Sequence, residues 1–350
     1  MEDNEIIPPS INRSREEQPN DSGQLPYIPK VRNMISIRSR FIKFFLVRHF
    51  MRRAFDPFEA SIGEIRQKAA KMSKKIKLPK DAHIEQISIG GMKAEWLRAS
   101  GVDEKSNKVT LYFHSGGFCL AYGNNHRDFA LRISKISNTK ILAVDYRLAP
   151  EYKYPAANDD CFNSYQWLLK QGYKPENIVI GGDSSGAGLA LMTLLSIRDS
   201  GIPLPKASFF LSIMGGDLRD FDGDSYSSRK TRDPLNTKEV IQRYGELYSG
   251  STVIGPPIKQ NFKGLPAMLI HVGDDEVLLS DSILLAERAK GEGIEVVFEV
   301  WKGMWHVFQG FAMMMPEAKR AVATLGMFIK NSFEDDSNQP VYSDAPESGA

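Results

Sequence analysis

The sequence predicts an α/β fold in which helices cover both faces of one mostly parallel sheet. Two observations predict it. From about residue 80, short runs rich in β-branched and aromatic residues alternate with longer helical patterns, as in βαβ proteins. The middle runs, KVTLYF and NIVIGG among them, are almost continuously apolar, as strands buried on both faces are.

The pattern predicts eight strands and six helices after residue 80. The strands are expected at 84–89, 93–99, 108–113, 140–146, 177–182, 207–213, 268–272 and 295–300. The helices are expected at 127–136, 158–171, 185–200, 237–249, 281–291 and 317–333. Asp281 suits a helix N-cap, while Gly172 and Gly201 suit the ends of the helices before them.

Composition sets limits on the class of protein but names no function. The 350 residues include 42% hydrophobic and 25% charged residues, which is ordinary for a globular protein. A formal net charge of +2 is too small for a nucleic-acid binder, so we expect no nucleic-acid partner.

The sequence favours a cytoplasmic protein. Cys119 and Cys161 are too few for a disulfide framework, and the N-terminal residues lack a signal-peptide pattern. The most hydrophobic segment, FIKFFLVRHF, is interrupted by Lys43 and Arg48, so we expect no membrane-spanning helix.

Both ends of the chain differ in composition from its middle. Residues 1–24 and 334–350 are polar and acidic, and we expect them to be mobile tails. Between Ser22 and Phe55 there are eight Lys or Arg residues and no Asp or Glu, interleaved with aromatic and aliphatic residues. This pattern predicts a basic amphipathic helical segment.

A candidate nucleophile lies between a strand pattern and a helix pattern. Residues 182–186 read G-D-S-S-G, which matches the nucleophile elbow G-x-S-x-G and nominates Ser184. Gly182 and Gly186 would permit a sharp turn without a Cβ clash. The alternatives are an ordinary glycine-rich turn or a phosphate-binding turn; against the latter, no GK[ST] follows and the spacing is not G-x-G-x-x-G.

Two further motifs carry a resemblance to a known family. His114-Ser115-Gly116-Gly117-Phe118 follows a predicted strand, and DYRLAPE occupies 145–151. With GDSSGAG at 182–188, the chain over roughly 80–330 resembles the hormone-sensitive-lipase family of esterases, which have the α/β-hydrolase fold and the motifs HGGG and GDSAG. The resemblance implies eight strands, an oxyanion hole made by the amides of Gly116, Gly117 and Ser185, and a bracing role for His114. Ser115 and Ser185 depart from the family motifs.

A serine nucleophile requires a histidine base, and in this fold the acid and the histidine follow the serine along the chain. His306 comes after a predicted strand and before the last helix. His271, the other histidine after Ser184, lies inside a strand pattern. We therefore expect His306 to be the base.

The third member of the triad is less clearly specified. The loop after strand 268–272 offers Asp274, Asp275, Glu276 and Asp281. The family pattern favours Asp275, with Asp274 as the second choice.

The resemblance also implies a helical cap, formed by residues 25–75 and 213–259, over a catalytic core of residues 76–212 and 260–333. The segment 212–218 lacks the Pro and Trp of the family's SPWxDL motif, so the pocket shape does not carry over. Apolar residues near the motifs are candidate substrate contacts, although each is equally expected in the core: Phe118, Leu120, Tyr122, Met214, Trp305 and Phe308.

The predicted function is hydrolysis of short to medium acyl esters through a Ser184–His306–Asp275 triad, with a small-molecule ester as substrate and no metal or cofactor. Three alternatives stay open: a lactone hydrolase or amidase with the same machinery, a non-catalytic binding protein on this scaffold, and a membrane-surface scaffold. Residues 30–53 fit a cap helix with a solvated basic face, which we favour, or weak peripheral membrane contact. Oligomeric state is open, with a homodimer among the expectations.

Overall fold

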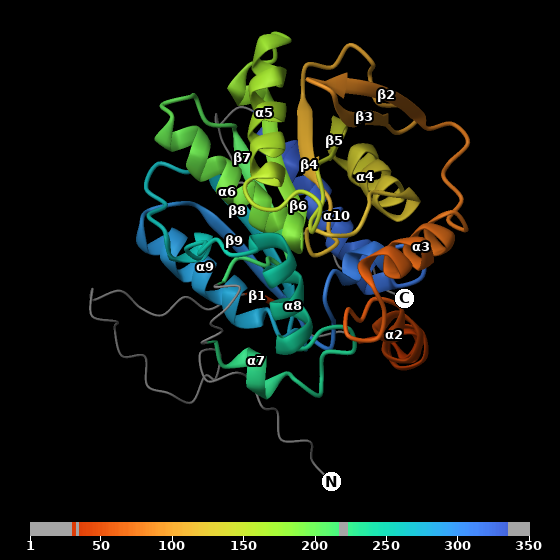
Figure 1. The fold of residues 1–350 in the computed structure, drawn as a ribbon. Coiled ribbons are helices and arrows are strands. Elements are labelled where there is room, and N and C mark those ends of the chain that lie inside the picture. Colours follow the sequence, from red (N-terminus) through yellow and green to blue (C-terminus); the bar gives the residue numbers. More distant parts are fainter. Residues whose placement is uncertain (1–29, 33–34, 217–222, 335–350) are drawn as a thin grey trace.

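The computed structural model describes residues 30–32, 35–216 and 223–334, and in this part of the chain the central feature is a nine-stranded sheet (Figure 1). The strand order is β1-β9-β8-β7-β6-β4-β5-β3-β2. Pairs β2/β3 and β3/β5 are antiparallel and the other pairs are parallel. The strands are β1 (Lys30–Arg32), β2 (His83–Ile89), β3 (Met92–Arg98), β4 (Val109–Phe113), β5 (Lys140–Asp145), β6 (Ile178–Asp183), β7 (Ala207–Leu211), β8 (Ala267–Gly273) and β9 (Val296–Trp301).

All eight predicted strands are present. The sheet has nine strands, one more than the eight that we expected. The additional strand, β1, lies in the segment that we expected to be part of a helical cap. It pairs in parallel with β9, and Arg32 Nη2 lies 2.6 Å from Glu299 Oε1. Three residues are too short for a periodic pattern, and their partner lies more than 260 residues away, so local sequence could not reveal this strand.

The six predicted helices are confirmed to within three residues at each end. They are α4 (Asn124–Ser137), α5 (Ala156–Lys170), α6 (Ser185–Asp199), α8 (Lys238–Ser249), α9 (Leu279–Gly291) and α10 (Pro316–Ser332). Gly172 and Gly201 take positive φ angles just after α5 and α6, as expected of helix ends. Asp281, however, is not an N-cap. It lies inside α9 and accepts hydrogen bonds from the Gly216 amide and the Tyr226 hydroxyl.

Two hydrophobic cores lie on opposite faces of the sheet. Along β4, Leu111 and Phe113 belong to one core and Tyr112 to the other, as strand alternation requires. Buried residues of α5, α6 and α9 fill the first core, and those of α4 and α10 fill the second. Since helices cover both faces, the carboxyl ends of the parallel strands are left to carry the polar site.

Two distant segments supply further helices, and Figure 1 shows α2 of the first and α7 and α8 of the second in the lower part of the molecule. The N-terminal segment contains α1 (Ile37–Phe41), the π-helix η1 (Ile42–Met51), α2 (Arg52–Ala54) and α3 (Ile62–Ser73), and the later one contains α7 (Ser225–Ser228), α8 and η3 (Pro257–Lys259). The predicted basic helical segment is thus confirmed for 37–54. The Tyr244 hydroxyl of α8 donates to the Phe55 carbonyl at 2.9 Å, and Arg48 of η1 donates to the Thr231 carbonyl at 3.1 Å.

Two expectations concern the ends of the chain and membrane insertion. The predicted mobile tails lie outside the described residues, apart from Glu334. Among the described helices, none combines the length and apolarity that crossing a bilayer requires.

Candidate active site

Ser184 occupies the turn between β6 and α6, as the elbow motif predicts. Its backbone has φ 55° and ψ −121°, a conformation that a non-glycine residue adopts only when the surrounding structure imposes it. The Ser184 amide donates to the Leu211 carbonyl of β7 at 2.8 Å, which fixes the turn against the neighbouring strand.

Close packing requires glycine at positions 182 and 186. This agrees with the expectation that glycines allow the turn without a Cβ clash. A Cβ on Gly186 would lie 2.1 Å from the Phe113 carbonyl oxygen, and one on Gly182 would lie 2.5 Å from the same atom. The first turn of α6 therefore packs directly on the end of β4, where the glycine loop 114–118 begins.

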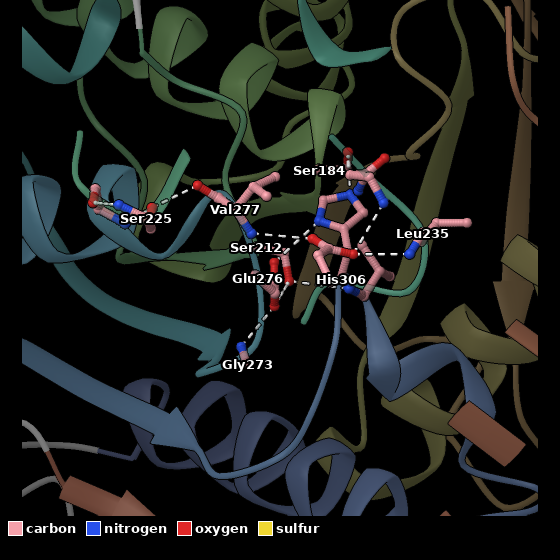
Figure 2. Close-up of polar contacts among 12 residues, drawn as sticks. Ser184, Ser212, Ser225, Leu235, Gly273, Glu276, Val277 and His306 are labelled. Carbon is pink, nitrogen blue, oxygen red and sulfur yellow. Dashed lines mark hydrogen bonds and ion pairs between the residues drawn. The ribbon is translucent and has the colours of Figure 1, made fainter. Parts of the chain in front are cut away.

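His306 reaches Ser184 from the loop after β9. Its Nε2 lies 2.8 Å from Ser184 Oγ, and both residues are buried (Figure 2). The structure thus brings together the predicted nucleophile and the predicted base at hydrogen-bond distance.

The acid in contact with His306 is Glu276 and not the predicted Asp275. His306 Nδ1 lies 3.1 Å from Glu276 Oε2, and Glu276 is fully buried. The other carboxylate oxygen, Oε1, accepts from Ser212 Oγ at 2.7 Å and from the Gly273 amide at 2.6 Å (Figure 2). These bonds hold the Glu276 carboxylate in one orientation toward the imidazole.

The side chains of Asp275 and Asp274 contact other partners. Neither of the two residues considered from the sequence is therefore the acid that contacts His306. Asp275 forms ion pairs with Lys43 of η1 and with Arg232. Asp274 accepts a hydrogen bond from the Gly303 amide. In the described part of the chain neither forms a hydrogen bond or ion pair with the imidazole, whereas the longer side chain of Glu276 reaches it. The only local signal for Glu276 was its place in the acidic run after β8.

The electrostatic surroundings of His306 favour its protonated form. Burial acts to lower the pKa of this imidazole, but the hydrogen bond and charge of Glu276 outweigh burial, helped by the charges of Asp233 and Asp183. The net result is a raised pKa.

Asp233 is a buried carboxyl near the site that sequence reasoning missed. It accepts hydrogen bonds from the amides of Leu235 (2.9 Å), Asn236 (2.9 Å) and Val277 (3.0 Å). Burial raises its pKa to about 6, although these amides act in the opposite direction. Since Val277 follows Glu276 in the chain, Asp233 fixes the backbone that carries the acid.

The glycine loop follows β4 directly. Gly116 has φ 132° and Gly117 has φ 58°, both in the region that favours glycine. Within the described part of the chain, neither amide has a backbone or side-chain acceptor. The Ser185 amide is at the first position of α6, where helix geometry supplies no internal acceptor. The three predicted donors are therefore available to a ligand.

His114 lies beneath this loop in the manner expected of a bracing residue. Its ring stacks on Tyr146 with centroids 4.3 Å apart, and the Tyr146 hydroxyl donates to the His114 carbonyl at 2.7 Å. Burial lowers the pKa of His114 to about 4, so the ring is neutral near pH 7.

The predicted apolar lining divides into two groups. Trp305 and Phe308 are fully buried in the core on the α4 and α10 face, which is the alternative that the sequence left open for each of them. Both side chains turn into the core beside Trp301 and Phe311. The other four lie around the loop or the elbow: Phe118 stacks on Tyr248 of α8, Leu120 closes the loop turn, Tyr122 stacks on His126, and the Met214 amide donates to the Ser184 carbonyl.

Comparisons with known proteins agree with this geometry. A family model described as alpha/beta hydrolase fold matches residues 110–310. An acetyl-hydrolase of Streptomyces hygroscopicus is 34% identical over 250 residues, covering 70% of this chain and 82% of that protein. The carboxylesterase/phospholipase LipF of Mycobacterium tuberculosis is 32% identical over 272 residues, covering 73% and 71%. A solved esterase from the bacterial hormone-sensitive lipase family has a TM-score of 0.79 at 34% identity, covering 86% and 99%.

The fold and these matches define the class: the chain belongs to the α/β-hydrolase family. Within that class it belongs with the esterases of the hormone-sensitive-lipase type, which confirms the resemblance carried by the loop 114–118, DYRLAPE and GDSSGAG.

Proposed function

We propose that this chain hydrolyses carboxylic esters of short to medium acyl length through an acyl-enzyme intermediate on Ser184. The observation that carries the proposal is the continuous chain of contacts from Ser184 Oγ to His306 Nε2 (2.8 Å) and from His306 Nδ1 to Glu276 (3.1 Å). This is the arrangement of nucleophile, base and orienting acid that acyl transfer requires.

In the first half-reaction, Ser184 Oγ attacks the ester carbonyl carbon while His306 Nε2 takes the hydroxyl proton. The amides of Gly116, Gly117 and Ser185 donate to the oxyanion, each donor typically contributing about 3–4 kcal/mol to transition-state stabilisation. Glu276 stabilises the imidazolium. Collapse breaks the bond to the leaving oxygen, and His306 returns the proton to the departing alcohol.

Water completes the cycle by the same route. His306 accepts a proton from water as the water oxygen attacks the acyl carbonyl, the same amides hold the second oxyanion, and the proton passes to Ser184 Oγ as the acid leaves. Activity toward lactones or amides would use the same steps.

The segments 25–75 and 213–259, whose described parts contain α1, η1, α2, α3, α7 and α8, would act as a cap. Their support is the packing of α8 on the glycine loop: a Cβ on Gly117 would lie 2.7 Å from the Tyr244 ring, and Phe118 stacks on Tyr248 with centroids 3.9 Å apart. This packing supports a role for α8 in shaping the acyl pocket, whose proposed lining is Phe118, Leu120, Tyr122 and Met214.

A series of p-nitrophenyl esters from acetate to palmitate tests the proposal. The wild type should favour the shorter members, and Ser184→Ala should lower kcat by about 10⁴–10⁶-fold. An organophosphate should label the wild type at Ser184 and leave the variant unlabelled. Wild-type rates in Ser184→Ala would refute the proposal, and parallel lactone and amide assays would rank the substrate classes.

A cytoplasmic location and a homodimer also belong to the proposal. Cys119 and Cys161 are buried free thiols, which suits a reducing compartment. Light scattering coupled to size-exclusion chromatography would measure the mass in solution.

A further inference from the structure

The N-terminal helical segment Ile37–Phe50 has apolar side chains on two opposite faces. Its inner face is formed by Ile42 and Val47, both buried against the core. Its outer side carries apolar residues that are between 50% and 86% exposed: Ile37, Phe41, Phe44, Phe45 and Phe50. We call this set the outer aromatic face. One buried face is enough to attach a helix to a globular protein, so the second face needs another explanation.

Three members of the outer aromatic face, Phe41, Phe44 and Phe45, form one cluster of rings. Phe45 lies 4.6 Å from Phe41 and 5.0 Å from Phe44, measured between ring centroids, and the His49 ring lies 5.0 Å from Phe44. Scattered exposed apolar residues are normal, but contiguous ones mark contact surfaces.

The charges around this face are of one sign. Arg38 and Arg40 precede most of it, and Arg52 and Arg53 follow it. Among the described residues, none of these four arginines has a carboxylate partner. The sequence from Ser22 to Phe55 contains no Asp or Glu to supply one. The face therefore lies in a positive field.

A basic cavity adjoins the same helix. Its volume is about 480 Å³, and five of its ten lining residues are Lys or Arg: Arg40, Lys43, Arg48, Arg232 and Lys302. Asp275, the single carboxylate of the lining, is paired with Lys43 and Arg232. Phe44 lines the cavity and also belongs to the outer aromatic face, so an anion in the cavity would lie beside the apolar surface.

We propose that Ile37–Phe50 docks this enzyme on an anionic phospholipid surface. The outer aromatic face enters the boundary between headgroups and acyl chains, and the arginines and the basic cavity contact lipid phosphates. A second copy of the chain fits the face poorly, because it would bring two sets of unpaired arginines together. The inference does not depend on the esterase reaction.

Vesicle co-sedimentation of the full chain tests the docking. Binding is expected to phosphatidylcholine vesicles that contain phosphatidylglycerol, to be weak to phosphatidylcholine alone, and to fall as salt rises. The double variant Phe41→Ser/Phe45→Ser should weaken binding at least ~10-fold, because each phenylalanine buries apolar area in the bilayer. Arg40→Gln/Arg53→Gln should weaken it ~10-fold at low salt.

Phe58→Ser is the matched control, because Phe58 is also exposed but lies outside the face. All variants should unfold at the wild-type midpoint temperature, which establishes that they are folded. Equal binding to both kinds of vesicle, or full binding by the double phenylalanine variant, would overturn the proposal. So would a native mass that doubles with concentration and returns to the monomer in that variant, since this would assign the face to a second copy.

Discussion

At the scale of single residues, the loop after β8 assigns different partners to adjacent carboxylates. Glu276 is fully buried, and it contacts His306, Ser212 and the Gly273 amide. Asp275 faces the cations Lys43 and Arg232 instead. Substitution of Glu276 and of Asp275 therefore tests which of these two adjacent carboxylates orients His306.

We expect Glu276→Gln to reduce kcat on p-nitrophenyl butyrate by about 10³–10⁴-fold, because the neutral amide no longer stabilises the imidazolium. Asp275→Asn should reduce it less than about 10-fold, since Asp275 does not contact His306. Thermal unfolding of both variants controls for misfolding. The reverse order of the two effects would restore Asp275 as the acid.

The pH dependence of kcat/KM reports the state of His306. Neutral imidazole is the base, so activity should rise with pH as His306 loses its proton, and the raised pKa places the inflection above the ordinary value of about 6.5. Glu276→Gln should move the inflection downward because it removes the main contribution that opposes burial. Asp275→Asn should leave it in place. An unchanged inflection in Glu276→Gln would contradict this account.

The sequence predicted the residues whose roles depend on local geometry. Ser184 and the two glycines belong to a five-residue turn, and His306 is identified by its place after a strand. Glu276 could not be chosen over Asp275 in this way, because the choice depends on Lys43 and Arg232, which come from distant segments. For Trp305 and Phe308 the sequence left core and pocket open, because an aromatic side chain near a site packs equally well into the core.

At the scale of elements, α3 is tied to the glycine loop by one side chain. Arg66 Nε donates to the Cys119 carbonyl and Nη2 to the Ala149 carbonyl, both at 2.7 Å, and its guanidinium forms two hydrogen bonds with Glu151. The loop that would hold the oxyanion is thereby braced from the N-terminal segment.

Arg66→Ala should therefore loosen the loop. We expect about 1–3 kcal/mol of destabilisation, from buried carbonyls left without donors, and a several-fold lower kcat/KM. Urea unfolding and ester kinetics measure the two effects. Lys330→Ala on α10, which loses only an exposed ion pair with Glu334, is the control and should change neither quantity. Equal effects of the two substitutions would refute the bracing role.

Elements with their own periodicity were predicted from sequence, and those held by distant partners were not. The six long helices have regular apolar spacing, and Gly172 and Gly201 follow two of them, so their positions were predictable. Asp281 looked like an N-cap because it precedes an apolar run, yet α9 begins earlier and the carboxylate binds Gly216 and Tyr226 across the structure.

At the scale of the whole molecule, the β1 edge of the sheet joins the N-terminal segment to the core through a buried charge. Glu299 of β9 is fully buried, with Arg32 Nη2 2.6 Å away on β1 and His271 Nε2 3.2 Å away on β8. Burial alone would raise the pKa of Glu299, but His271 and Arg32 together lower it to about 2. Farther along the same N-terminal segment, Lys43 forms an ion pair with Asp275, which lies in the loop after β8.

This lowered pKa predicts a defined loss of stability in acid. The unfolded chain binds a proton at Glu299 near pH 4.3, whereas the folded protein does so only near pH 2. The contribution of ionised Glu299 to the free energy of unfolding is therefore complete above pH 4.3 and is lost as pH falls toward 2. Its size is roughly 3 kcal/mol. Glu299→Gln should be less stable than the wild type at pH 6, and the difference should shrink by pH 3, measured by urea unfolding.

Glu85→Gln on β2, at the opposite edge and exposed, should follow the wild type throughout. A gap between Glu299→Gln and the wild type that stayed constant from pH 6 to pH 3 would show that the buried charge does not couple sheet stability to pH.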